Sequence, residues 1–187
     1  MKILAIADKK PSIPIKETLI KEGVDLIITL GDLERSEIAE LEHITNTPKI
    51  GVYGNHCFPG YMETLGIYNM HMHTWSYDGL TFGGFEGCVR YKNTPYVKMY
   101  TQDEASALME YFPYVDVFIA HAPPFGINDE EDPAHVGFKA FRTYLEEKRP
   151  KYFLHGHTYP TKESLVTKFL DTEIIYIHGD AIVDFCI

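Results

Sequence analysis

Short apolar runs alternate with helix-like spacing along the first third of the chain. Uninterrupted apolar runs predict buried strands at residues 2–7, 25–30 and 49–53. Between them, apolar residues spaced three and four apart predict helices at 14–22 and 35–43. Strands that are separated by helices favour a largely parallel sheet with helices on its faces.

The middle of the chain predicts a hairpin, and the remainder returns to the alternation of strand and helix. Asp78-Gly79 lies between two strand-like runs, 74–77 and 80–85, and this dipeptide is a strong hairpin signal. The remaining predicted elements are helices at 103–112 and 137–148, strands at 115–120 and 152–154, and two strands within 173–187 around a turn at Gly179-Asp180. No repeat or linker interrupts the pattern, so residues 1–187 are expected to form one domain.

Composition and charge narrow the class of protein. The 187 residues are 45% hydrophobic, which suits a globular chain with a sizeable core, and no apolar run approaches the ~20 residues that a membrane span needs. The strand-like start is too short for a signal peptide, and the three cysteines fit neither a disulfide framework nor a cysteine zinc site, so a cytoplasmic location is expected. A net charge of −10 argues against duplex DNA as a partner, but not against a small anionic substrate at a metal site.

Residues that can bind metal ions follow the carboxyl ends of five predicted strands. In an open α/β sheet this edge binds ligands, so the five segments are expected to meet in one cleft. A mixture of carboxylate, amide and imidazole groups suits Mn²⁺, Fe²⁺ or Zn²⁺. The residues are Asp8, Asp32, Asn55 with His56, His121, and His155 with His157.

The order of these residues resembles the motif series of the calcineurin-like metallophosphoesterases. Each motif alone is weak, whereas the ordered set from Asp8 to Tyr159 is specific. The matching segments are Gly31-Asp32, Gly54-Asn55-His56, His121-Ala122-Pro123-Pro124-Phe125-Gly126, His135-Val136-Gly137 and Gly156-His157-Thr158-Tyr159. The third and fourth segments resemble the metallophosphodiesterase branch in particular. The resemblance implies an α/β/β/α sandwich, in which two mixed β-sheets are flanked by helices.

The family resemblance also implies two metal ions that share one aspartate. By position, Asp32 is the bridging aspartate and Asp8 belongs to the first metal. His56 is expected beside the substrate, where it donates to the phosphate or protonates the leaving oxygen. The protein ligands of the second metal are then Asp32, Asn55, His121 and His157.

Two departures from the family pattern remove imidazoles from the site of Asp8. The family has Asp-x-His where this chain has Asp8-Lys9-Lys10. It has Gly-His-x-His where this chain has Gly156-His157-Thr158-Tyr159, so the last histidine of the motif is replaced by Tyr159. One tight metal site and one weak or absent site are therefore expected. A protonated lysine has no lone pair for a metal, so Lys10 is interpreted as a catalytic residue that places a positive charge beside Asp8 and Asp32, as a substitute for the first cation. The alternative is a solvated loop lysine.

The sequence predicts metal-dependent hydrolysis of a phosphate mono- or diester by a metal-activated water. The substrate is expected to be small, for example a nucleotide, and the metal to be Mn or Fe, with Zn, Ni and Mg as alternatives. The alternative function is a non-catalytic protein that binds a nucleotide, a phosphate or a partner protein on the same scaffold. The oligomeric state and the roles of His135, His155, Tyr159 and His178 stay open.

Overall fold

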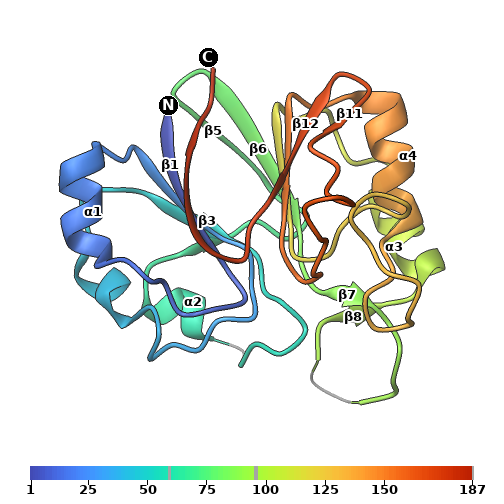
Figure 1. Cartoon of the computed structure of the whole chain (residues 1–187), viewed down its shortest axis with the longest axis horizontal. Coiled ribbons are helices and arrows are strands. Elements are labelled where there is room, and N and C mark those ends of the chain that lie inside the picture. The colour runs from blue at the N-terminus through green and yellow to red at the C-terminus, as the bar shows by residue number, and fades with distance from the viewer. Residues whose placement is uncertain (59, 95–96, 187) are drawn as a thin grey trace.

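Two large mixed β-sheets pack face to face, and helices cover their outer faces (Figure 1). The computed structural model describes residues 1–58, 60–94 and 97–186. This layering confirms the α/β/β/α sandwich that the family resemblance implied.

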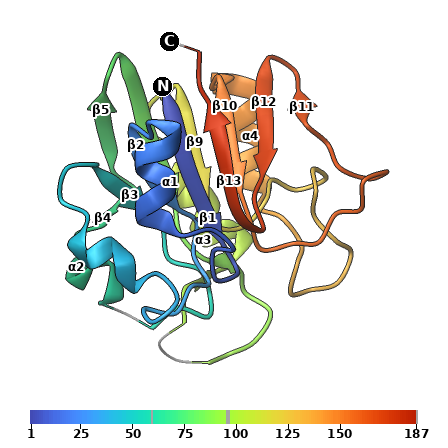
Figure 2. The same cartoon turned by 60° about the vertical axis from the view of Figure 1, so that its left-hand side comes forward.

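The first sheet has the strand order β13-β1-β2-β3-β4. Four strands run parallel, and β13 pairs antiparallel with β1, beside which it lies in Figure 2. The strands are β1 (Lys2–Ala7), β2 (Leu26–Thr29), β3 (Lys49–Gly51), β4 (Tyr68–Asn69) and β13 (Gly179–Asp184). The helical segments between them are α1 (Ile15–Glu22), the 3₁₀ helix η1 (Ala39–His43) and α2 (Tyr61–Thr64).

The second sheet has the order β11-β12-β10-β9-β6-β5, with β6, β9, β10 and β12 parallel. Its strands are β5 (Thr74–Tyr77), β6 (Leu80–Phe85), β9 (Val117–Ala120), β10 (Tyr152–His155), β11 (Lys168–Phe169) and β12 (Thr172–Tyr176). The outer helices are α3 (Gln102–Met109) and α4 (Lys139–Lys148), and β7 (Cys88–Val89) pairs with β8 (Met99–Tyr100). Asp78 and Gly79 both have positive φ, as the predicted tight hairpin requires.

The core is divided by the alternation of side chains along the strands. In β1, Ile3 and Ala5 face the second sheet, whereas Leu4 and Ile6 pack under α1 and η1. Phe118 of β9 lies on the opposite side of the second sheet, in a cluster with the aromatic residues of α4. Buried side chains on both faces of the central strands explain why these strands appear in the sequence as continuous apolar runs.

Two predicted elements are wrong in detail. Residues 35–43 form turns and the short η1 rather than one α-helix, with backbone bonds of the i to i+3 type from Leu41 to Ile38. Gly179-Asp180 is not a turn between paired strands, because β13 begins at Gly179 and lies in the other sheet from β12. At Gly179-Asp180 the local sequence signals a turn, and only the pairing of β13 with β1 shows that a strand begins there.

Two further observations concern the surroundings in which the chain works. Among the described residues, no helix combines the length and the apolar character that a membrane span requires. Cys57, Cys88 and Cys186 are free thiols. The cytoplasmic location and the single domain over residues 1–187 stay predictions.

Replacing Phe118 by alanine should destabilise the fold strongly. The side chain is fully buried and its ring packs against Phe112, Phe141 and Phe153. Truncation should lower the free energy of unfolding by about 3–5 kcal/mol, measured by urea denaturation. The matched control is Tyr111→Ala, since Tyr111 is 85% exposed and should change stability by no more than about 0.5 kcal/mol. A loss below ~1 kcal/mol for Phe118→Ala would contradict this packing.

Candidate metal centre

Polar side chains directly follow five strands of the two sheets, at the edge of the sandwich where these strands end. Asp8, Asp32 and Asn55 follow β1, β2 and β3 of the first sheet. His121 and His157 follow β9 and β10 of the second sheet. These side chains therefore lie at the seam between the sheets, with carboxylate and amide groups from the first sheet and imidazoles from the second.

Three of these residues turn sharply as their strands end. Asp8, Asp32 and His157 have φ of 62°, 51° and 71°, in the left-handed region that side-chain-bearing residues rarely adopt. Strained conformations of this kind persist where the surrounding structure fixes them, and they cluster at functional sites.

Glycines allow the segments to approach one another. A Cβ at Gly54 would overlap the carboxylate of Asp32, and a Cβ at Gly156 would overlap that of Asp8. The presence of glycine before Asn55 and His157 in the sequence motifs thus has a steric explanation, because any larger residue would displace an aspartate.

Three of the predicted ligands form a compact group. Asp32, His121 and His157 each offer a ligand atom within 4.8 Å of the others. Nε2 of His121 lies 3.0 Å from Oδ1 of Asn55 and 3.4 Å from Oδ2 of Asp32. His121 is fully buried and Asn55 is 2% exposed. The four side chains that were predicted for the second metal therefore lie together.

Hydrogen bonds select which nitrogen of each histidine faces the centre. Nδ1 of His121 donates to the Leu30 carbonyl at 2.8 Å, so its Nε2 points at Asp32 and Asn55. Nε2 of His157 donates to the Ala134 carbonyl at 2.8 Å, which leaves Nδ1 as the nitrogen with a free lone pair. Backbone acceptors that fix the ring in this way are typical of metal-binding histidines. One carboxylate, one amide oxygen and two imidazoles fit a divalent transition metal.

Charges inside the centre are strongly coupled. Burial lowers the pKa of His121, but Asp32 and Asp8 outweigh it and raise the pKa to about 9. Burial raises the pKa of Asp32, yet the adjacent His121 holds it well below the ordinary range. Burial and the His121 charge lower the pKa of His157 to about 3. Without a metal, the centre is an imidazolium paired with a carboxylate.

Asp8 lies beside this group. Its Oδ2 accepts the backbone N–H of His157 at 2.9 Å, and its Oδ1 lies 4.0 Å from Nδ1 of His121. Its side chain is only 8% exposed, and burial raises its pKa. The same Oδ2 is 4.0 Å from Nδ1 of His178.

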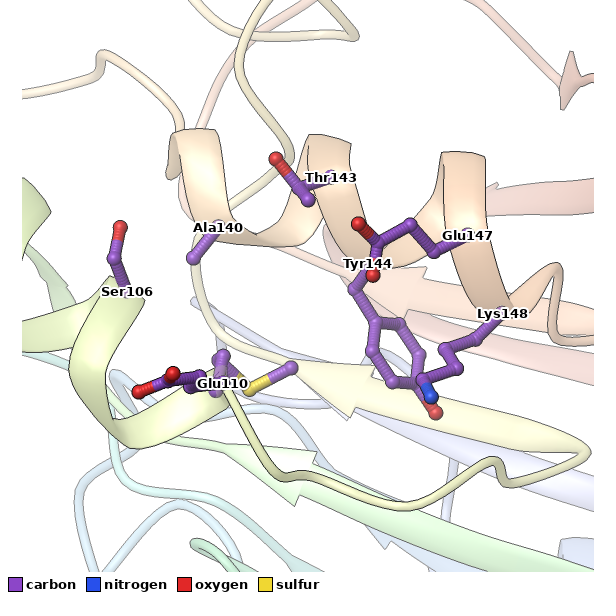
Figure 3. Close-up of a pocket in the computed structure, with 8 residues that line it drawn as sticks. Ser106, Glu110, Ala140, Thr143, Tyr144, Glu147 and Lys148 are labelled. Carbon is purple, nitrogen blue, oxygen red and sulfur yellow. The ribbon is translucent and has the colours of Figure 1, made fainter.

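His56 is positioned by its backbone, and its side chain forms no hydrogen bond with the residues that the structure describes. Its N–H donates to Oδ1 of Asp32 at 2.7 Å, and the residue is exposed. It lines a cavity of about 480 Å³ together with Arg35 and Phe58. A second cavity, of about 310 Å³, lies between α3 and α4 (Figure 3) and includes no residue of the centre.

Lys10 and Tyr159 occupy the positions where the family has imidazoles. Lys10 is exposed, and within the described part of the chain it forms no ion pair with Asp8 or Asp32. Tyr159 is 60% exposed, and its ring packs edge-on against those of His135 and His178. A catalytic role for Lys10 stays a prediction.

His155 and His135 have other partners. Nε2 of His155 accepts from Asn128 at 3.0 Å and its Nδ1 donates to the Gly156 carbonyl, so both nitrogens are used. Nδ1 of His135 lies 2.8 Å from Asp132, in a separate loop cluster with Glu130. His135 still lies near the centre, with its ring 5.2 Å from that of His157.

Sequence reasoning missed the role of Cys57. Its Sγ accepts the backbone N–H groups of Asp32 and Gly54, each at 3.1 Å, and burial raises its pKa, which keeps the thiol neutral. The thiol thereby joins the loops after β2 and β3. The role of His178 was left open, although this residue follows the end of β12 as the predicted ligands follow their strands.

Residues 1–160 match the profile of the calcineurin-like phosphoesterases, and the chain belongs to this family. One solved structure is 17% identical with a TM-score of 0.66, covering 93% of this chain and 89% of that chain. The protein TT1561 of Thermus thermophilus is 16% identical with a TM-score of 0.59, covering 94% and 88%. GAP50, described as the anchor in the inner membrane complex of Plasmodium, is 12% identical with a TM-score of 0.55, covering 94% and 70%. These likenesses show a shared fold; no curated protein matches.

Metal affinity at the centre should rise with pH. A metal ion must displace the proton of His121, whose pKa is raised from 6.5 to about 9, so below pH 9 each unit costs up to about tenfold in affinity. Calorimetric titration with Mn²⁺ between pH 6.5 and 8.5, in buffers of different ionisation enthalpy, should count about one released proton. Equal affinity across this range, with no proton released, would contradict a charged His121.

The stability of the metal-free protein should change with pH in the opposite direction, falling as the pH rises. Because folding raises the pKa of His121, its contribution to stability is complete below about pH 6.5 and is lost as the pH rises through about 9. Urea denaturation of the metal-free protein at pH 7 and 9.5 should show this loss.

Proposed function

We propose that this chain is a metal-dependent phosphoesterase that hydrolyses small phosphate mono- or diesters. The observation that carries the proposal is the group of Asp32, His121 and His157 within 4.8 Å, with Asn55 at hydrogen-bonding distance of His121. Membership of the calcineurin-like phosphoesterase family supports the same reaction class. The metal that we propose is Mn or Fe, with Zn, Ni and Mg as alternatives.

Each residue of the centre has a separate task in this proposal. The chemistry supplied by a bound ion is the polarisation of a phosphoryl oxygen and a lowered pKa for water. Asp32, Asn55, His121 and His157 hold that ion. His56 protonates the leaving oxygen or donates to the phosphate, and its backbone bond to Asp32 keeps it beside the centre.

The cavity next to His56 supports a small organic leaving group. It has a volume of about 480 Å³ and is lined by Phe58, whose ring is 82% exposed, and by Arg35. An exposed aromatic face can stack on a nucleobase, and the guanidinium of Arg35, which also pairs with Glu42 at 2.6 Å, can bind a second anionic group. A nucleotide fits this combination.

A non-catalytic binding protein is the second candidate. The specific observation in its favour is the exposed Tyr159 in place of an imidazole, which leaves the site of Asp8 short of ligands. The description of GAP50 as an anchor names a non-enzymatic task for a protein of the same fold. Hydrolysis of chromogenic mono- and diesters with added Mn²⁺ separates the two candidates, since a binding protein would show no turnover above that of Asn55→Ala.

Removing a ligand and removing the proton donor should have different effects. Asn55→Ala and His157→Ala should each lower Mn²⁺ affinity by more than about tenfold, because each deletes a protein ligand. His56→Ala should leave Mn²⁺ affinity nearly unchanged and reduce kcat by about 10²–10⁴-fold, the usual range for general acid catalysis. Calorimetry and steady-state kinetics on the three variants measure these effects.

The matched control for these variants is His43→Ala, which removes an exposed imidazole on η1 and should change neither quantity. Turnover in purified His56→Ala equal to that of the unmodified protein would remove His56 from the mechanism. Activity that survives complete chelation would overturn the metal dependence.

Metal occupancy should be unequal. Asp32, Asn55, His121 and His157 offer four ligands at one position, whereas the position of Asp8 lacks the two imidazoles of the family pattern. Elemental analysis of the protein as purified should therefore find nearer one tightly held ion than two. Two equally tight ions would contradict the proposed difference between the sites.

A further inference from the structure

The end of β12 brings a histidine to the metal centre that the family motifs do not include. β12 runs parallel to β10, and the N–H of Ile177 donates to the His155 carbonyl at 2.8 Å. His178 therefore stands beside the turn that carries His157, at the same edge of the sheet. It continues the series of strand ends from which Asp8, Asp32 and His121 also come.

One nitrogen of this histidine lacks a partner. Nδ1 of His178 is buried and has no hydrogen-bond partner among the described residues, although the side chain as a whole is 22% exposed. A buried polar atom left unpaired is unfavourable, so its place in the structure calls for a missing partner. The atom that it faces is Oδ2 of Asp8, 4.0 Å away, which is too far for a hydrogen bond.

We propose that His178 is a metal ligand and that its Nδ1 replaces a missing imidazole at the site of Asp8. The two ligand atoms that the structure brings together at this site are Oδ2 of Asp8 and Nδ1 of His178. This inference rests on the proposed function, because it concerns the second ion of the same centre.

The distance fits two ligands of one ion. Nitrogen and oxygen ligands lie about 2.0–2.2 Å from a divalent transition metal, so two of them can be up to about 4.2 Å apart. The 4.0 Å between Asp8 and His178 is within this limit and leaves room for an ion between the atoms. The rings of Tyr159 and Tyr176 lie 5.3 and 6.4 Å from that of His178 and restrict its orientation.

The neighbouring candidates do not provide this ligand. Tyr159 and Lys10 are exposed, and both nitrogens of His155 have partners. The site of His178 nevertheless stays weaker than the four-ligand site, because Lys9 is close enough to act electrostatically on His178 and opposes a cation there. The unequal occupancy of the centre is thus retained, with the second ion bound loosely rather than absent.

The test uses the metal-stripped, full-length protein and Mn²⁺ alone. Calorimetry on the unmodified protein should resolve a tight and a weaker binding event. His178→Ala should weaken the second event by more than about tenfold and change the tight event by less than about twofold. His178→Asp should restore the second event, because a carboxylate can ligate Mn²⁺ but cannot reproduce the packing of an imidazole.

Electron paramagnetic resonance gives a readout that does not depend on activity. With two equivalents of Mn²⁺, the unmodified protein and His178→Asp should show the signal of two coupled ions, and His178→Ala should not. His43→Ala is the control for adventitious binding to an exposed histidine. Thermal denaturation of each variant shows that it is folded, and His178→Leu, whose side chain has no ligand atom, replaces the alanine variant if that variant is unfolded.

The outcomes separate this inference from the proposed function. A single binding event in the unmodified protein, or two unchanged events in His178→Ala, would overturn the role of His178 and leave the tight site intact. The absence of any tight event in the unmodified protein would overturn both. Loss of both events in a folded His178→Ala would assign His178 a structural role instead of a ligand role.

Discussion

The contact of His121 with the loop after β2 is the interaction on which the centre depends. His121 comes from the second sheet, whereas Leu30, which accepts from its Nδ1, and Asp32, which faces its Nε2, belong to the first. An imidazole with no exposed surface is thus held at both nitrogens by the other layer of the sandwich. The packing of the two sheets therefore determines the geometry of the ligands, and any shift between the layers would separate nitrogen from carboxylate.

The strained strand ends follow from the same constraint. A strand that continued straight would carry Asp8, Asp32 or His157 past the boundary between the two sheets. The left-handed backbone conformation at each residue keeps its side chain at the metal centre. Hydrogen bonds around the turns offset the conformational cost: Cys57 accepts from the N–H of Asp32, and Asp8 accepts from that of His157. The loops of the centre are thus linked to one another by hydrogen bonds. The neutral thiol of Cys57 therefore has a structural role at a site whose chemistry does not need sulfur.

Much of the fold could be predicted because its central strands are buried on both faces. Residues 2–7 and 115–120 appear as apolar runs for that reason, and the ordered polar residues at their ends revealed the centre. Elements that depend on tertiary pairing could not be predicted: the two-residue strand Tyr68–Asn69 has no period to detect, and β13 is assigned to its sheet only by pairing with β1. Likewise, no sequence signal distinguishes the backbone carbonyl of Ala134, which selects the nitrogen of His157, from its neighbours.

Loss of two imidazoles from a centre of this kind does not have equal consequences for its two halves. In the half that contains His121 both histidines are buried and each ring is fixed by a backbone carbonyl, that of Leu30 for His121 and that of Ala134 for His157, so this half does not depend on the groups beyond Asp8. The other half opens toward Tyr159 and Lys10, where exposed side chains replace enclosed ones. Asp8 nevertheless stays 8% exposed and directs one oxygen toward the unpaired nitrogen of His178. Burial raises the pKa of Asp8, so the charged form of this carboxylate depends on the groups that counteract burial, which are His121, the N–H of His157 and His178.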